Sequence, residues 1–443
     1  MECNDCEAID TGSSTADPNP NTTLYRQFRR FSPLLTLAGI YPWQTSHTKF
    51  GKTIRIVSWI PCVLLFLLML ASALERLIVT CIHQVDEPNP VGLAAELRLV
   101  TMVCFRFSVA IVVPLCCWKT RKLDAVICMI STLCNDVFVK QPWRNYKTAV
   151  SSMLTVLSAF FFGYFIFSSS FWLMDALAYP HSLLESAYSF FLLVTRITAM
   201  HIRLVFYALV MTVISITGLQ FSVYCKTVKN MFRQTHSCAA KEYQIRQILN
   251  EHLSLSKAVE KLDKILSPLL LVTVPLDLTV TIFLCAHVFD GSKIADKLAY
   301  ETLKHSSKLS SILCVFDLTW LLLVLFGPIA ASAYLKQQAE RIVKEIIQFI
   351  GYEDLENKFK HELTKRAAQI KDFPPVITLW NITALDRNVL LVVLGILGTY
   401  LFIILEVSQW YEGVSELADA AVGAGGENQT ASQRYLIMRR LVR

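Results

Sequence analysis

Ionisable side chains inside long apolar runs are the residues of this chain whose types and positions could do chemistry. Six of them interrupt such runs: Arg106, Arg196, Arg203, Asp277, Asp317 and Glu406. A charged side chain at membrane depth is costly, so each should face protein or water and mark a ligand site or an ion path. For all except Glu406, the alternative is an ion pair that only holds helices together, such as Arg106 or Arg196 with Asp277 or Asp317.

No common enzyme motif accompanies these charges. The sequence lacks a His-Glu-x-x-His zinc motif, a P-loop and a glycine-rich dinucleotide loop. We therefore expect no enzymatic activity, no catalytic residue, no metal site and no cofactor.

Seven apolar runs have to position the charged side chains. The chain has 443 residues, of which 54% are hydrophobic and 17% are charged. Soluble domains carry about 25% charged residues, so this composition indicates an integral membrane protein. About 20 apolar residues cross a bilayer as a helix. Runs of at least that length lie at approximately residues 54–74, 99–118, 149–173, 183–224, 265–288, 311–334 and 389–407. We therefore predict an all-α bundle of seven transmembrane helices, in which 183–224 is one long, tilted helix.

Lys and Arg are distributed unevenly between the segments that connect these runs. Of the 42 Lys and Arg residues, 28 lie in residues 1–53, 119–148, 225–264 and 335–388, and 10 lie in the connections of the other side. The positive-inside rule then predicts an intracellular N-terminus and an extracellular C-terminus in the plasma membrane. The same bias accounts for the net charge of +7 without a nucleic acid. Of three Asn-x-Thr sequons, only that of Asn428 is extracellular in this topology and a candidate for glycosylation.

Two polar segments beside the expected spans carry apolar residues at helical spacing. They are Ile245, Ile248, Leu249, Leu253, Val259, Leu262 and Ile265 in the first segment, and Ile342, Val343, Ile346, Ile347 and Ile350 in the second. Spans four, five and six should therefore continue as helices on the cytosolic side. An apolar stripe on a polar helix has to be buried. We expect neighbouring subunits to bury it, with a bundle inside one subunit as the alternative.

The outer halves of spans two to six could line a cavity that opens to the outside. The candidates for ligand binding there are Arg106, Tyr164, Trp172, Arg196, Asp277, Thr281, Asp317 and Trp320. Aromatic residues with a few polar groups suit a small polar ligand such as a sugar or an amine. For Trp172 the alternative is a plain anchor at the membrane interface.

The last apolar run carries a short motif. Thr399 and Tyr400 are followed by five apolar residues, and Glu406 and Val407 come next. This pattern resembles the signature of the last helix in the insect gustatory receptor family, which belongs with the odorant receptors to one chemoreceptor superfamily. The stretch Ala384-Leu385-Asp386 before this helix is similar to the family, and so is the segment 31–42 near the N-terminus. The family has Gln-Phe where this chain has Glu406 and Val407, which is typical of a divergent member.

The resemblance implies a ligand-gated, non-selective cation channel. It implies a homotetramer, with a hetero-oligomer as the alternative, in which the seventh helices line a central pore. Gly395 and Gly398 thin one face of this helix, and Phe402, Ile403, Glu406 and Val407 would form the pore and its gate. Four Glu406 side chains would make an acidic ring that favours cations and holds protons or a divalent ion. Without the resemblance, a packed helix with one satisfied Glu explains the stretch equally well.

These observations divide the chain into four parts. They are a cytosolic tail with a juxtamembrane segment (1–53), helices one to six with their cytosolic extensions forming an anchor domain (54–375), the pore-lining seventh helix (376–410) and an extracellular tail (411–443). The expected function is a gustatory-type chemoreceptor that binds a small-molecule tastant and conducts cations across the lipid bilayer. A metabotropic seven-helix receptor and a secondary transporter are the alternatives, although the predicted orientation opposes the first and no inverted repeat supports the second.

Overall fold

The computed structural model describes five long segments of the chain. They are residues 183–233, 238–289, 307–352, 356–379 and 382–423, and shorter described stretches lie between residues 60 and 170, of which 66–75 and 122–133 are the longest. The tail 1–53 and most of expected spans two and three lie outside the described residues, as do Arg106, Tyr164, Trp172 and Asn428. The predictions made for these parts stay predictions.

Five helices make up nearly all of the described segments, as the all-α prediction requires. They are α6 (Leu183–Arg233), α7 (Cys238–Phe289), α9 (Ser307–Tyr352), α10 (Asn357–Asp372) and α11 (Arg387–Gly423). The first three contain 51, 52 and 46 residues. At 1.5 Å per residue each is about 70–80 Å long, more than twice the thickness of a bilayer core. The predictions that the fourth run is one long helix and that runs five and six continue beyond their apolar parts are confirmed.

Within the described segments, two helices are long and apolar enough to cross a bilayer by length and composition. They are Val205–Met231 in α6 and Lys241–Ile282 in α7, and shorter apolar helices lie at Phe66–Glu75 and Arg387–Ile403. The number of spans and the orientation of the chain stay predictions.

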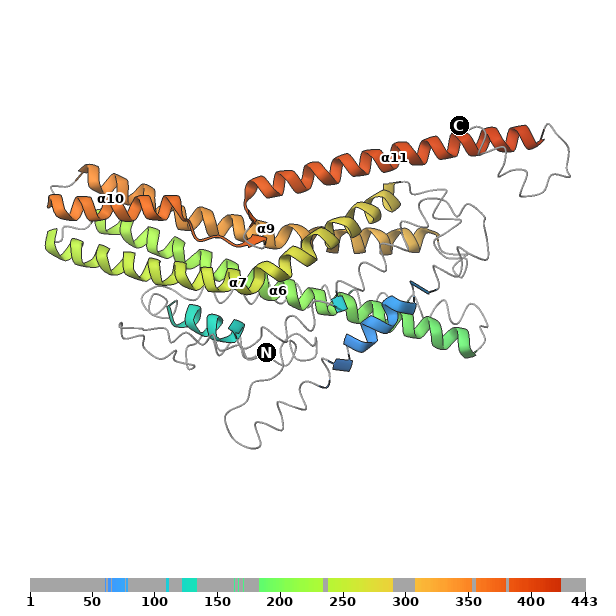
Figure 1. The fold of residues 1–443 in the computed structure, drawn as a ribbon, viewed down its shortest axis with the longest axis horizontal. Coiled ribbons are helices and arrows are strands. Elements are labelled where there is room, and N and C mark those ends of the chain that lie inside the picture. Colours follow the sequence, from blue (N-terminus) through green and yellow to red (C-terminus); the bar gives the residue numbers. More distant parts are fainter. Residues whose placement is uncertain are drawn as a thin grey trace, which may run out of the picture.

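At one end of the molecule, α6, α7, α9 and α10 form a four-helix bundle, the left-hand part of Figure 1. We call this part the distal bundle: residues 218–233, 238–264, 335–352 and 357–372. The fourth helix, α10, was not anticipated, and it packs through its buried residues Phe359, Leu363 and Ala367. Its Phe359 ring lies under the guanidinium of Arg246 on α7, 4.9 Å from the ring centroid.

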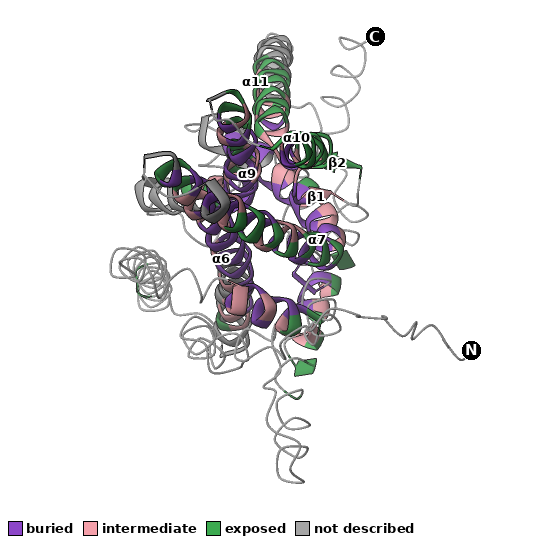
Figure 2. Cartoon of the chain, turned by 90° about the vertical axis from the view of Figure 1, so that its left-hand side faces the viewer, coloured by how far each residue is buried: buried purple, intermediate pink, exposed green. Residues whose placement is uncertain are grey.

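The apolar stripes of the extensions are buried inside this one chain. Ile245, Leu262 and Ile342 are at most 1% exposed, and Figure 2 shows the buried side of each helix turned inward. The expectation that neighbouring subunits bury these stripes is therefore wrong, and the alternative of a bundle inside one subunit holds. The physical reason is α10, which closes a core that three extensions alone would leave thin. Leu253 and Ile350 are only partly buried, and Ile347 is 58% exposed.

Helices α6 and α9 run side by side with their backbones close together. A Cβ atom at Gly218 of α6 would lie 2.9 Å from the Tyr334 ring and 3.2 Å from the Cα of Leu335 on α9. Glycine is needed here because any larger residue would push the two helices apart. Seven residues earlier on each helix, Gly327 of α9 lies against the Met211 side chain of α6. The two helices therefore run parallel over this length.

The segment 376–410 does not form a single helix as predicted. Its first part is a hairpin of β1 (Thr378–Leu379) and β2 (Thr383–Ala384), paired Thr378 to Ala384 and Leu379 to Thr383. Helix α11 begins only at Arg387 and continues to Gly423, beyond the predicted end. The helix starts where Asp386 can cap it, and the preceding Pro374 and Pro375 favour extended backbone.

Candidate functional site

A buried ion pair joins α6 to α7 in the apolar part of the molecule. The guanidinium of Arg203 on α6 donates to one carboxylate oxygen of Asp277 on α7, and the hydroxyl of Tyr207 donates to the other. The side chains of Arg203 and Asp277 are 3% and 0% exposed. Both oxygens of the carboxylate thus accept hydrogen bonds from side chains of the protein itself. A buried charge needs such partners to offset the loss of water.

The sequence predicts an ion pair for Asp277, with Arg106 or Arg196 as example partners. The structure instead pairs Asp277 with Arg203. It adds a second partner, Tyr207, for which no prediction was made. The spacing of Arg203 and Tyr207 is a signal that could have found both, because residues four apart lie on one face of a helix. The arrangement supports the interpretation of Asp277 as part of an ion pair between helices.

The remaining candidate ligand residues of the described segments lie on α6, α7 and α9. The Thr281 hydroxyl is buried and donates to the main-chain carbonyl of Asp277 at 2.6 Å, which satisfies it within α7. Arg196 is in α6, two turns before Arg203, and Asp317 and Trp320 are in α9. Because α6 and α9 run parallel, the position of Asp317 is at about the level of Arg203 along the helices. Their role in ligand binding stays a prediction.

Helix α11 diverges from the other labelled helices after its first two turns (Figure 1). Val393 is 5% exposed, but the large apolar residues that follow are open: Tyr400 is 54%, Phe402 62% and Ile403 46% exposed. At Gly395 and Gly398, no atom would come within 4 Å of an added Cβ.

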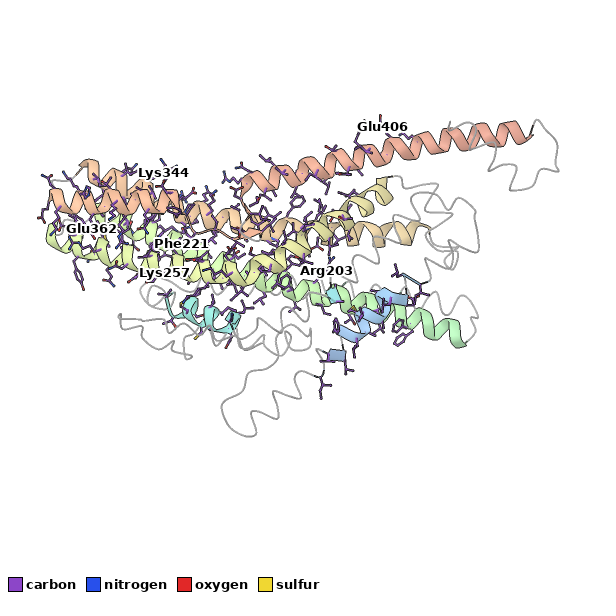
Figure 3. All side chains as sticks on the ribbon, viewed as in Figure 1. Arg203, Phe221, Lys257, Lys344, Glu362 and Glu406 are labelled. Carbon is purple, nitrogen blue, oxygen red and sulfur yellow. The ribbon has the colours of Figure 1, made fainter. Side chains whose placement is uncertain are left out.

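The motif residues occupy the open part of this helix. Thr399 and Glu406 are exposed, and Glu406 is labelled near the middle of α11 in Figure 3. Val407 continues the helix. Most of the predicted span of α11, an apolar helix with one acidic side chain, is thus not packed against any other described residue.

The start of α11 is held by the segment Ile377–Asp386, which we call the connector hairpin. Its Thr378 donates from the main-chain N–H to Asp263 of α7 at 2.6 Å, and the Thr378 hydroxyl lies 2.9 Å from the second carboxylate oxygen. Ser267, one turn further along α7, has its hydroxyl 3.2 Å from the Thr378 hydroxyl. Ile377 and Leu385 are 0% and 1% exposed and joined by a main-chain hydrogen bond of 2.8 Å.

Asp386 at the end of the connector hairpin has two roles. One carboxylate oxygen accepts the N–H groups of Asn388 at 2.9 Å and Val389 at 3.4 Å, which caps α11. The other accepts from the Lys336 ammonium of α9 at 2.9 Å. Burial acts to raise the pKa of Asp386, but Lys336 and the two N–H groups outweigh it, so the pKa lies below its usual range. The carboxylate is therefore charged at neutral pH.

Comparison with known proteins gives a structural likeness and no sequence match. No family model matches this sequence, and no curated protein matches it either. Two solved structures, both of the insect olfactory receptor OR5 from Machilis hrabei, one in complex with eugenol, resemble the chain with a TM-score of 0.58 each. They cover 87% of this chain and 98% of the receptor chain at 16% and 15% sequence identity. The chain therefore has the fold of this insect olfactory receptor.

Proposed function

We propose that this protein is a gustatory-type chemoreceptor and a ligand-gated, non-selective cation channel. The observation that carries the proposal is α11, whose Tyr400, Phe402 and Ile403 are about half exposed or more in the single chain. A helix of this kind needs cover from lipid or from other helices, and the exposed Glu406 argues against lipid. Water on one side of α11 and protein on the other meet both needs, which is the situation of a pore-lining helix.

The proposed assembly is a homotetramer with one α11 per subunit around a central pore. Identical subunits close into a ring through one repeated interface, so each α11 would cover the same part of its neighbour. The open faces at Gly395 and Gly398 support this arrangement, since they leave room for a neighbouring helix. Glu406 would then form an acidic ring in the cation path, with Phe402, Ile403 and Val407 as its apolar neighbours.

The ligand in this proposal is a small molecule bound between the helices of the outer half. OR5 from Machilis hrabei, which shares the fold, was solved with eugenol. The motif at Thr399 and Tyr400 supports the gustatory branch, and the aromatic and polar candidates suit a small polar tastant. The ligand would open the pore by binding the open state more tightly than the closed state.

Substituting Glu406→Gln tests the pore. In cells expressing the full chain, currents evoked by a panel of sugars, amines and eugenol should persist in the variant. The ratio of divalent to monovalent permeability should fall several-fold because the ring loses its charge. Gln409→Asn, one turn further on the exposed side of α11, is the control and should leave the ratio unchanged. Currents with an unaltered ratio in Glu406→Gln would remove the acidic ring from the proposal.

The predicted orientation is tested by mapping glycans on Asn21, Asn381 and Asn428. In the full chain expressed in insect cells, removal of the Asn428 sequon by Asn428→Gln should abolish a glycan that Asn21→Gln and Asn381→Gln leave in place. The reason is that Asn428 carries the only one of the three sequons that is extracellular in the proposed topology. A glycan on Asn21 would reverse the orientation and favour a metabotropic receptor instead.

A further inference from the structure

The connector hairpin is the part of the chain that attaches α11 to the helices around it. Of the apolar residues early in α11, Val393 is 5% exposed, whereas Leu391, Val392 and Leu394 are 66%, 58% and 46% exposed. Within the described residues, α11 therefore packs against the other helices of its subunit only near its start, and it diverges from them beyond that point (Figure 1). Among the contacts of the described residues, those at the start of α11 are therefore the ones through which a movement of α7 or α9 would reach this helix.

The first attachment of the connector hairpin is to α7. Asp263 is 6% exposed, and its two carboxylate oxygens accept the N–H and the hydroxyl of Thr378. Hydrogen bonds to an ionised acceptor are about twice as strong as neutral ones, and burial strengthens them further. The attachment point lies five residues before Pro268, at the end of the distal bundle.

The second attachment is to α9, from the other side of the hairpin. The Lys336 ammonium donates to Asp386 at 2.9 Å, and the two side chains are 27% and 16% exposed. The next residue of each segment makes a parallel contact, because Arg387 donates to Gln337 at 2.9 Å. Since Asp386 also caps α11, the Lys336 contact acts directly on the first turn of that helix.

The two attachments are made to different helices at one level of the molecule. Asp263 and Lys336 lie where α7 and α9 leave the distal bundle, and α10 holds the other end of the connector in that bundle. The connector hairpin is thus attached to the distal bundle through α10. Its contacts with α7 and α9 hold the first turn of α11 in place. A relative shift of α7 and α9 would change the two contacts by different amounts.

We propose that the connector hairpin couples α7 and α9 to the opening of the pore, through the contacts of Thr378 with Asp263 and of Asp386 with Lys336. The proposal rests on the proposed channel function and names the contacts that regulate it. Coupling requires that these contacts differ in strength between the closed and open states, because a contact that is equal in both shifts nothing. Loss of either contact then changes how often the channel opens and leaves the pore itself unaltered.

The test is single-channel recording of the full chain with eugenol, sucrose and an amine as probes. Lys336→Met removes the ion pair, and Asp386→Asn removes it while keeping a good capping residue on α11. Thr378→Val removes the hydroxyl contacts with Asp263, and Thr378→Ser keeps them. Lys257→Met is the matched control, because Lys257 is an exposed lysine of the distal bundle on α7, six residues before Asp263.

The expected result is a change of at least about fivefold in the equilibrium between closed and open states in Lys336→Met, Asp386→Asn and Thr378→Val. Single-channel conductance should stay that of the unmodified chain, Thr378→Ser should restore normal opening, and Lys257→Met should resemble the unmodified chain. The effects of Lys336→Met and Asp386→Asn should not add when combined, since they break the same contact.

Three outcomes would overturn the proposal, and they differ in whether the channel function falls with it. Normal opening in all three variants, with currents present, overturns the coupling role and leaves the channel function standing. Absence of any current from the unmodified chain, purified and reconstituted in vesicles, overturns the channel function and the coupling role together. A loss of surface protein in Thr378→Val that Thr378→Ser restores, with normal opening of the channels that do reach the surface, would show that the contact serves folding alone.

Discussion

Asp277→Ala is expected to lower the free energy of unfolding by about 3–5 kcal/mol, because it leaves the guanidinium of Arg203 and the hydroxyl of Tyr207 buried without their acceptor. Asp277 is 0% exposed, so water cannot replace the lost carboxylate without opening the contact between α6 and α7. The measurement is the apparent melting temperature of the detergent-solubilised chain, together with its yield at the cell surface. Both should fall clearly below those of the unmodified chain.

Two further variants separate the loss of a charge partner from the loss of packing. The triple variant Arg203→Met, Tyr207→Phe, Asp277→Leu removes every polar member of the cluster and should recover most of the lost stability. Thr279→Val on the same helix removes only a local hydrogen bond to the Pro275 carbonyl and should change stability little. If Asp277→Ala melted normally and instead lost its response to a ligand, Asp277 would be a ligand contact after all.

The second large effect concerns pH and His252 in the distal bundle. His252 is 1% exposed on α7, with its ring 4.6 Å from that of Phe221 on α6. Burial lowers the pKa of His252 to about 4, although the main-chain carbonyl of Ala339 acts in the opposite direction. In the unfolded chain the pKa is about 6.5. Between about pH 4 and about pH 6.5, His252 is therefore protonated in the unfolded chain and neutral in the folded chain.

The stability of the distal bundle should therefore fall as the pH is lowered from about 6.5 to about 4. The contribution of His252 is fully present above pH 6.5 and is lost progressively below it, up to a total on the order of 3 kcal/mol. Melting temperatures measured between pH 4 and 7.5 would show this slope. His252→Leu should have a shallower slope, because the buried group that has to stay neutral is gone.

His361 provides the control for this experiment. It lies exposed on α10 of the same bundle, so His361→Leu leaves the core around His252 intact and should keep the slope of the unmodified chain. An equal slope in His252→Leu and the unmodified chain would show that other groups cause the acid sensitivity.

Much of the helical framework could be predicted from the sequence. The runs at residues 183–224, 265–288 and 311–334 are apolar for too long to be anything but helices, and the stripes beside them repeat at helical spacing. The last apolar run is helical from Arg387 onward, and its motif at Thr399 and Tyr400 resembles that of insect chemoreceptors, one of which shares the fold of the chain. Each of these signals is local, so a single stretch of sequence carries it.

The partners of the functional residues could not be predicted in the same way. A stripe such as Ile245 and Leu262 requires burial, but its spacing does not say what buries it. The structure supplied α10, from the same chain, where neighbouring subunits were expected. Likewise, the charge of Asp277 required a partner, and three arginines in apolar runs were available to provide one.

By itself the sequence determined that this protein is helical, apolar and built on long helices, and it marked Asp277 and Glu406 as residues that need an explanation. The tertiary structure alone decided that Arg203 and Tyr207 satisfy Asp277, and that Asp263 and Lys336 hold the start of α11. The physical reason is distance along the chain: Thr378 meets a carboxylate 115 positions away. Periodicity records which face of a helix is buried, whereas only packing fixes which side chains meet there.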